Sequence, residues 1–304
     1  MPVGWDDATE AVLTGDLTAA LGYRTPAGGA VVMAVAPIGL HHRGEGRVGF
    51  TTSLGFSKKL GRIALDPRVA LAFHAREHGT SSSSAYVLVQ GRAHVVEQPT
   101  PARKQEVFAH AARYLGAPRR GRFWDAWLRE YGDVRVPVDV AVERIVVWPD
   151  LRCAGTPVVH GAPLPEPPPP QQPPKNGTGP RVDAERVAKR IARTAHVLLA
   201  YCGADGYPVV VPVTVARAGS EGLRLAADAS LPAGGRRAGL LGHAYRAKLV
   251  GLLTRQHTGW LDGDLYAPHT ETGYRAPPNK TLLLLLNGAL AKRGVRQARK
   301  AGKL

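Results

Sequence analysis

Hydrophobic and polar positions in the first quarter of the chain predict a strand, a glycine loop, a short helix and a second strand. Residues 48–52 are mostly β-branched or aromatic, which is typical of a strand, and Leu54-Gly55 ends it. Ser57 is a good helix N-cap, and the helix stops at Asp66-Pro67 because the residue before a proline avoids the α conformation. Residues 69–73 are apolar again and predict the second strand.

The same patterns predict a mainly β chain whose second half weakly repeats the first. In the first half we expect strands at 30–36, 86–96 and 138–148, and helices at 8–21, 100–115 and around 123–128. In the second half we expect strands at 196–201, 208–215, 223–227 and 249–253, with helices at 183–195 and after Gly235 as far as Tyr245.

A proline-rich stretch separates the halves. Nine prolines lie between Ala162 and Arg181, and such a run adopts the extended polyproline II conformation of a semi-rigid spacer. We therefore predict a domain at 1–160, a linker at 161–181 and a second domain at 182–304.

The composition is that of an ordinary globular protein. With 304 residues, 44% hydrophobic and 21% charged, the chain has room for about two domains. No apolar run approaches the roughly 18 residues of a membrane span, and the N-terminus does not read as a signal peptide. The two cysteines have no metal-ligand spacing, which favours a reducing cytoplasm. Abundant Arg, Ala, Gly and Pro favour a GC-rich, actinobacterial genome.

The net charge of +16 has three competing explanations: binding of nucleic acid, of an anionic membrane surface, or of polyanionic small molecules such as phosphorylated cofactors. Only 6% of residues are aromatic and no helix-turn-helix or zinc-finger spacing is present, which argues against sequence-specific nucleic-acid binding. The C-terminal tail has two interpretations. Five leucines from Leu282 precede basic residues that end with Lys303, so the helix either packs on the core, which we favour, or makes a peripheral contact with an anionic membrane.

The predicted short helix carries candidate chemistry at its start. Free backbone N–H groups, the Ser57 hydroxyl and the ammonium groups of Lys58 and Lys59 come together there, and Thr51 or Thr52 could point to the same place. Helix N-termini bind anions, and lysine is a workable phosphate ligand. The alternative is a solvated helix start. The histidines have no metal-ligand spacing, so no metal site is predicted.

The whole arrangement, Phe-Thr-Thr, then Ser-Lys-Lys, then a proline and Arg-Val-Ala-Leu-Ala-Phe, resembles the pyridoxamine 5′-phosphate oxidase-like split β-barrel superfamily over about residues 30–96. The resemblance implies that Ser57, Lys58, Lys59 and Thr51 or Thr52 hold a cofactor phosphate. The family often has arginine where this chain has Lys58, and that change loses the bidentate fork. The implied architecture is mainly β with flanking helices: two split β-barrel domains that form an intrachain pseudo-dimer.

The resemblance also implies a function, a flavin- or deazaflavin-dependent oxidoreductase that transfers a hydride to or from a small organic substrate. We favour F420 over FMN because a basic surplus suits a polyglutamate tail. The alternative is a non-catalytic cofactor- or haem-binding protein. When the halves are aligned, Gly235-Arg236-Arg237 takes the place of Ser57-Lys58-Lys59, which predicts a degenerate second site. The chain is expected to be a monomer with an internal pseudo-dimer, or a higher homo-oligomer.

Overall fold

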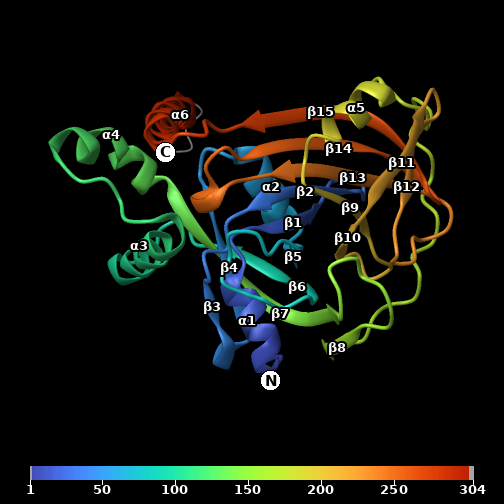
Figure 1. The fold of residues 1–304 in the computed structure, drawn as a ribbon, viewed down its shortest axis with the longest axis horizontal. Coiled ribbons are helices and arrows are strands. Elements are labelled where there is room, and N and C mark those ends of the chain that lie inside the picture. Colours follow the sequence, from blue (N-terminus) through green and yellow to red (C-terminus); the bar gives the residue numbers. More distant parts are fainter. Residues whose placement is uncertain (1, 301–304) are drawn as a thin grey trace.

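Two antiparallel sheets form the centre of the molecule, and helices flank them, as predicted (Figure 1). The computed structural model describes residues 2–300, with side chains as far as Arg296. The first sheet contains β1 (Ala19–Arg24), β2 (Ala30–Val35), β3 (His41–His42), β4 (Arg47–Ser53), β5 (Arg68–Phe73), β6 (Tyr86–Val95), β7 (Arg135–Trp148) and β8 (Val158–Gly161). The second contains β9 (His196–Cys202), β10 (Pro208–Pro212), β11 (Thr214–Gly219), β12 (Gly222–Ala226), β13 (Gly235–Ala244), β14 (Leu253–Asp262) and β15 (Leu265–Arg275).

The two sheets have the same topology. The first runs β2-β1-β5-β6-β7-β4-β3, with β8 added to β7, and the second runs β10-β9-β13-β14-β15-β12-β11. When the strands of each half are numbered from its own beginning, these orders are identical. The predicted internal repeat is therefore present in the fold.

Helices surround the sheets but do not repeat as faithfully. They are α1 (Asp7–Gly15), α2 (Ser57–Leu65), α3 (Pro101–Leu115), α4 (Arg122–Asp133), α5 (Ala184–Ile191) and α6 (Lys280–Lys300), with the 3-10 turns η1 (Arg43–Glu45) and η2 (Ala247–Leu249). In the second half no helix corresponds to α2, since a loop joins β12 to β13. Figure 1 shows α3, α4 and α6 gathered on one side of the molecule. No described helix has both the length and the hydropathy that crossing a membrane requires.

The two sheets pack against each other through a hydrophobic cluster to which both contribute, so the predicted intrachain pseudo-dimer is confirmed. Buried residues of both halves form a single cluster, among them Ala70 and Ala72 from the first and Leu198 and Leu241 from the second. Strand β2 packs on β13 and β14, while β10 packs on β5 and β1. Two side-chain amides form hydrogen bonds across the contact. Gln90 Nε2 donates to the carbonyl of Pro208, and Gln256 Nε2 donates to the carbonyl of Val32, each at 2.7 Å.

Close packing between the halves depends on small residues. A Cβ atom at Gly239 would lie 2.8 Å from the carbonyl oxygen of Ala30 and 3.2 Å from the backbone of Val31 and Val32. Backbone atoms cannot move aside as a flexible side chain can, so β13 approaches β2 this closely only with glycine at position 239.

The proline-rich segment is bound to both halves and is not a free spacer. Residues 162–183 contain no helix or strand. The Gln171 backbone N–H donates to the carbonyl of Gly235 at 2.7 Å, and the Gln171 side chain donates to the carbonyl of Gly28 at 2.9 Å. The segment therefore fastens the halves together as a strap.

A pair of buried histidines lies between the sheets at equivalent positions. His74 follows Ala70 by four residues, and Ala70 pairs with β1, the first strand of its half. His243 follows Gly239 by four residues, and Gly239 pairs with β9, the first strand of the second half. Their Nε2 atoms are 2.6 Å apart. Because His74 Nδ1 donates to the carbonyl of Ala72, His74 Nε2 accepts and His243 donates. Burial lowers the pKa of His74 to about 3 and also lowers the pKa of His243, so both rings are neutral.

The stretch that follows the second-half loop differs from the prediction. The helix expected after Gly235 and through Tyr245 is wrong, because residues 235–244 form strand β13. The long hairpin of β14 and β15 was not predicted in full either. Leu240 and Leu241 of β13 are both buried, so its sequence lacks the alternation that marks a strand with one solvated face.

We expect Gly239→Val to lower the free energy of unfolding by about 1–3 kcal/mol, the usual cost of overpacking a close contact. Gly219→Val is the matched control, since a Cβ atom at Gly219 has no neighbour within 4 Å. Urea unfolding of both variants measures the difference. Equal losses would show that the close approach of β13 to β2 does not limit packing.

We expect the histidine pair to make the fold sensitive to acid. The folded pKa values lie below the usual value of about 6.5, so the contribution is full above that pH and is lost as the pH falls toward about 3. The slope is about 1.4 kcal/mol per pH unit for each histidine. His74→Asn combined with His243→Asn should flatten this part of the profile relative to the wild type, whereas His94→Asn, at an exposed position, should not. A profile unchanged by the double substitution would contradict the assignment.

Candidate anion-binding site

The start of α2 is an open helix end. Helix α2 begins at Ser57, and Phe56 at the cap position makes no side-chain hydrogen bond to the first turn. Ser57 is therefore the first helical residue and not the N-cap that the sequence predicted. The N–H groups of the first turn have no side-chain cap, and such groups bind anions.

Lys59 is the most buried of the three predicted site residues on α2. Its side chain enters the protein with only 6% exposed, while Ser57 and Lys58 lie exposed on the surface. The Lys59 ammonium lies 4.7 Å from the centre of the Phe56 ring. No carboxylate among the described residues pairs with it. Buried lysines usually have such a partner, so Lys59 is an unusual feature of this helix.

A second cation lies close to Lys59. Arg135, the first residue of β7, donates from Nη2 to the hydroxyl of Thr51 at 2.6 Å and from Nη1 to the hydroxyl of Tyr131 at 3.0 Å. Burial, together with a smaller contribution from repulsion by Arg135, lowers the pKa of Lys59 to about 7. Two neighbouring cations with no carboxylate form a site that an anion would neutralise. We call Thr51, Lys59, Arg135 and the start of α2 the cradle.

The side chains of the two predicted threonines, Thr51 and Thr52, lie on opposite faces of strand β4. Both are buried, but adjacent residues on a strand point to opposite faces, so Thr52 faces away from Thr51 and the cradle. The Thr52 hydroxyl has no hydrogen-bond partner among the residues that the structure describes. The sequence did not reveal Arg135, because β4 and β7 are neighbours only through long-range pairing, in which Ser53 lies opposite Arg135.

Helix α6 flanks the cradle. Gly294 of α6 meets Gly55 in the loop before α2, since a Cβ atom at Gly294 would lie 3.8 Å from the Gly55 Cα. Ala291 and Val295 pack beside Val134 of the first half. The last helix of the second half thus returns to the candidate site of the first.

The predicted second site is not brought together. The Arg236 side chain is buried, with 1% exposed, and donates to the backbone carbonyls of Ala233 and Pro168 at 2.5 and 3.2 Å. The Arg237 backbone N–H donates to Gln171 of the strap at 3.0 Å. Both arginines belong to strand β13, which is equivalent to β5, so they are not at a helix start. Their contacts hold the strap.

Among the side chains that the structure describes, no three from His, Cys, Asp or Glu lie close enough together to hold a metal ion. Cys153 and Cys202 are both buried and free.

The comparisons with known proteins concern half of the chain at a time. No family model and no curated protein matches. A conserved hypothetical protein of Mycobacterium tuberculosis is 21% identical and covers 50% of this chain and 88% of its own, with a TM-score of 0.37. An F420 reductase is 22% identical and covers 45% of this chain and 94% of its own, with a TM-score of 0.33. A pyridoxamine 5′-phosphate oxidase-related, FMN-binding protein of Nostoc punctiforme is 11% identical and covers 43% of this chain and 73% of its own, with a TM-score of 0.29.

The likeness is one of fold. Each of these structures covers about half of this chain. The similar structures include a pyridoxamine 5′-phosphate oxidase-related protein and an F420 reductase, the kinds of protein that the sequence resembles.

We expect Lys59→Met to stabilise the protein when no anion is present. A charged lysine is costly to bury, and methionine keeps most of its volume, so at about pH 6 the free energy of unfolding should rise by about 1–3 kcal/mol. The wild type should gain stability as the pH rises from about 7 toward 10.5, because the unfolded state then holds the proton that folded Lys59 has lost. Lys59→Met should lack that gain.

Added inorganic phosphate shows whether the effect of Lys59→Met comes from the loss of an anion-binding charge or only from a change in packing. It should raise the melting temperature of the wild type and leave that of Lys59→Met nearly unchanged, because binding to the folded state stabilises it by mass action. A less stable Lys59→Met protein that phosphate still protects would contradict the cradle.

Proposed function

We propose that the chain is an oxidoreductase that binds a flavin-type cofactor by its phosphate at the cradle. The observation that carries the proposal is the buried, unpaired Lys59 beside Arg135, because two cations without a carboxylate suit a phosphate dianion. The proposal carries over to this chain the cofactor class named for the FMN-binding and F420 reductase structures.

Each cradle residue has a separate task in this proposal. Lys59 neutralises the phosphate from within, and the backbone N–H groups of the first turn of α2 donate to its oxygens, with the exposed Ser57 hydroxyl and the Lys58 ammonium at the rim. Arg135 adds a second charge and holds the Thr51 hydroxyl in place. The bound cofactor would supply hydride transfer, and the protein positions it and excludes water. The contact between Gly55 and Gly294 places α6 at the side of the cradle, where it limits access by solvent.

We favour F420 over FMN as the cofactor, with a small organic molecule as the substrate. The net charge of +16 suits a cofactor with several negative charges more than one with a single phosphate. A single chain is sufficient in this proposal, because the two sheets already pair within it.

Titration of the purified protein with F420, FMN and haem tests the proposal, with absorbance or fluorescence as the readout. We expect Lys59→Ala to weaken binding of the preferred cofactor by about 1.5–3 kcal/mol, or tenfold and more in Kd. Ser57→Ala should cost less, since the backbone donors remain. Affinity should fall as the pH rises above about 7, where Lys59 loses its proton, and Lys59→Arg should remove that dependence.

The control is Arg217→Ala, at an exposed position on β11. A loss equal to that of Lys59→Ala would mean that only the net charge attracts the cofactor, and moderate salt would then abolish binding. Binding of haem alone, with a Soret band and no affinity for either flavin-type cofactor, would support the non-catalytic alternative. Reduction of the bound cofactor by a screened donor in single turnover would establish hydride transfer.

A further inference from the structure

The loop between α3 and α4 exposes aromatic and basic side chains together. Every residue from 117 to 123 is exposed, including Arg119, Arg120 and Arg122. Phe123 at the start of α4 is 59% exposed. A phenylalanine exposed to this degree and surrounded by arginines is unusual on a surface that only faces water.

The aromatic side chains form an ordered cluster. The Phe123 ring is stacked on Trp127 at 6.1 Å and meets Trp124 edge-on at 5.2 Å. Arg119 lies over Trp124, and Lys292 of α6 lies over Trp127 at 4.2 Å. Rings and cations therefore support one another, and the cluster is held in place before any partner arrives.

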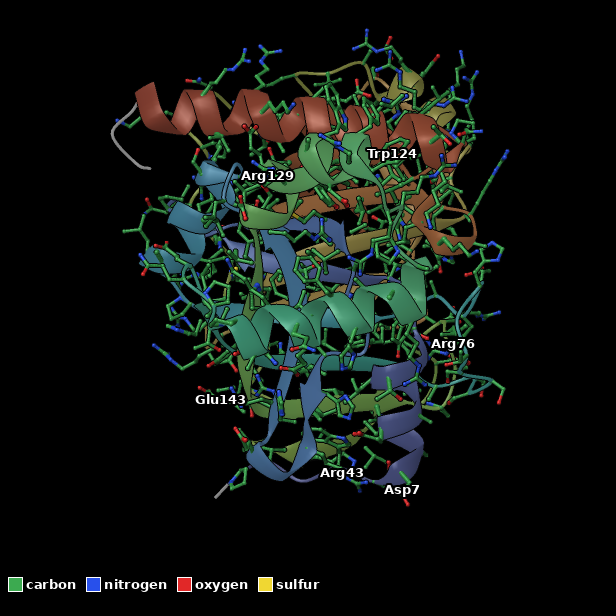
Figure 2. All side chains as sticks on the ribbon, turned by 90° about the vertical axis from the view of Figure 1, so that its left-hand side faces the viewer. Asp7, Arg43, Arg76, Trp124, Arg129 and Glu143 are labelled. Carbon is green, nitrogen blue, oxygen red and sulfur yellow. The ribbon has the colours of Figure 1, made fainter. Side chains whose placement is uncertain are left out.

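Helix α6 extends this surface. The Arg119 Nη2 atom donates to the Thr281 hydroxyl at 2.7 Å, and the Trp127 Nε1 atom donates to the carbonyl of Leu285 at 3.3 Å. A Cβ atom at Gly288 would lie 2.3 Å from Trp127 Nε1, so glycine is needed there for the helices to meet. Figure 2 shows α6 along one end of the molecule, with Trp124 near its junction with α4.

The exposed face of α6 has the same mixed character. Leu282 and Leu290 are 54% and 47% exposed, and Arg293 and Arg296 are exposed on the following turns. The sequence contains no carboxylate from Val107 to Trp124, nor from Thr272 to the C-terminus. The surface made of residues 119–123 and the exposed face of α6, which we call the basic tip, is therefore apolar and strongly positive.

We propose that the basic tip docks on the surface of an anionic phospholipid membrane. Its positive charges complement lipid phosphates, and Phe123, Leu282 and Leu290 can enter the boundary between headgroups and acyl chains. Single-stranded RNA fits less well, because exposed leucines do not stack on bases. The contact is peripheral, since no described helix is able to span a bilayer. It does not depend on the proposed cofactor.

Sedimentation of the full-length protein with vesicles tests the proposal. We expect binding to vesicles of equal parts phosphatidylglycerol and phosphatidylcholine, and at least tenfold weaker binding to phosphatidylcholine alone. Arg120→Glu combined with Arg122→Glu should weaken binding to the mixed vesicles at least tenfold. Phe123→Ser combined with Leu290→Ser should weaken it severalfold and make the remaining binding more sensitive to salt, because only the electrostatic part is left.

The matched control is Arg193→Glu combined with Arg217→Glu, which changes the charge equally at exposed positions just after α5 and on β11, two elements that Figure 1 shows away from α3 and α4. It should retain binding. Equal loss in the control would overturn the proposal in favour of attraction by net charge alone. Unchanged binding in the Phe123→Ser, Leu290→Ser variant would overturn the insertion of apolar side chains. Dimers or retained single-stranded RNA, without vesicle binding, would assign the tip to a second copy or to nucleic acid. Thermal unfolding of each variant checks that it folds.

Discussion

The shared core between the two sheets is the constraint on which the rest of the structure depends. Strands β2 and β10 stay paired within their own sheets and also pack on strands of the other sheet, so each half buries part of its apolar surface against the other. Alanine and glycine positions let the backbones approach, and Gly239 shows how little room remains. The strap and the histidine pair complete the same contact. A chain that contains both halves makes internally the pairing that separate chains would have to find by association, at no cost in translational freedom.

The segment from β4 to β5 could be predicted from the sequence because its signals are local. A β-branched strand, a glycine loop and an Asp-Pro helix end can each be recognised from a few neighbouring residues. The observed helix N-cap, Phe56, lies only one residue from the predicted N-cap, Ser57. The cradle was only partly predictable. Lys59 followed from its place in the helix, but Arg135 comes to the cradle through strand pairing, where it contacts Thr51 at a separation of 84 residues along the chain. Strand β13 is buried on both faces, so its sequence lacks the polar–apolar alternation by which a strand is recognised. The role of the strap depends on partners in both halves, which no local sequence pattern indicates.

The two halves have diverged in what their equivalent segments do. In the first half, α2 lies between β4 and β5 and opens its N-terminus beside a buried lysine. In the second, the loop before β13 has no helix, and Arg236 is engaged by backbone carbonyls around the strap. The Nη2 atom of Arg236 is directed at those carbonyls, and the side chain lies inside the protein and not at an open helix end. One half thus carries the candidate site, while the other supplies structural support and, through α6, a wall for that site.

Burying the charge of Lys59 in the cradle costs folding free energy, and the proposed binding of a phosphate would offset that cost. An unpaired ammonium with 6% exposure opposes folding, and a neighbouring guanidinium increases the opposition, which is why the pKa of Lys59 falls to about 7. The well-packed interface between the sheets can offset such a local cost. A bound phosphate would reverse it: the anion restores the proton on Lys59, satisfies the open N–H groups of α2 and removes the repulsion between the two cations. The same groups that weaken the empty site would therefore strengthen the loaded one, and ligand binding and folding stability would be coupled through a single lysine.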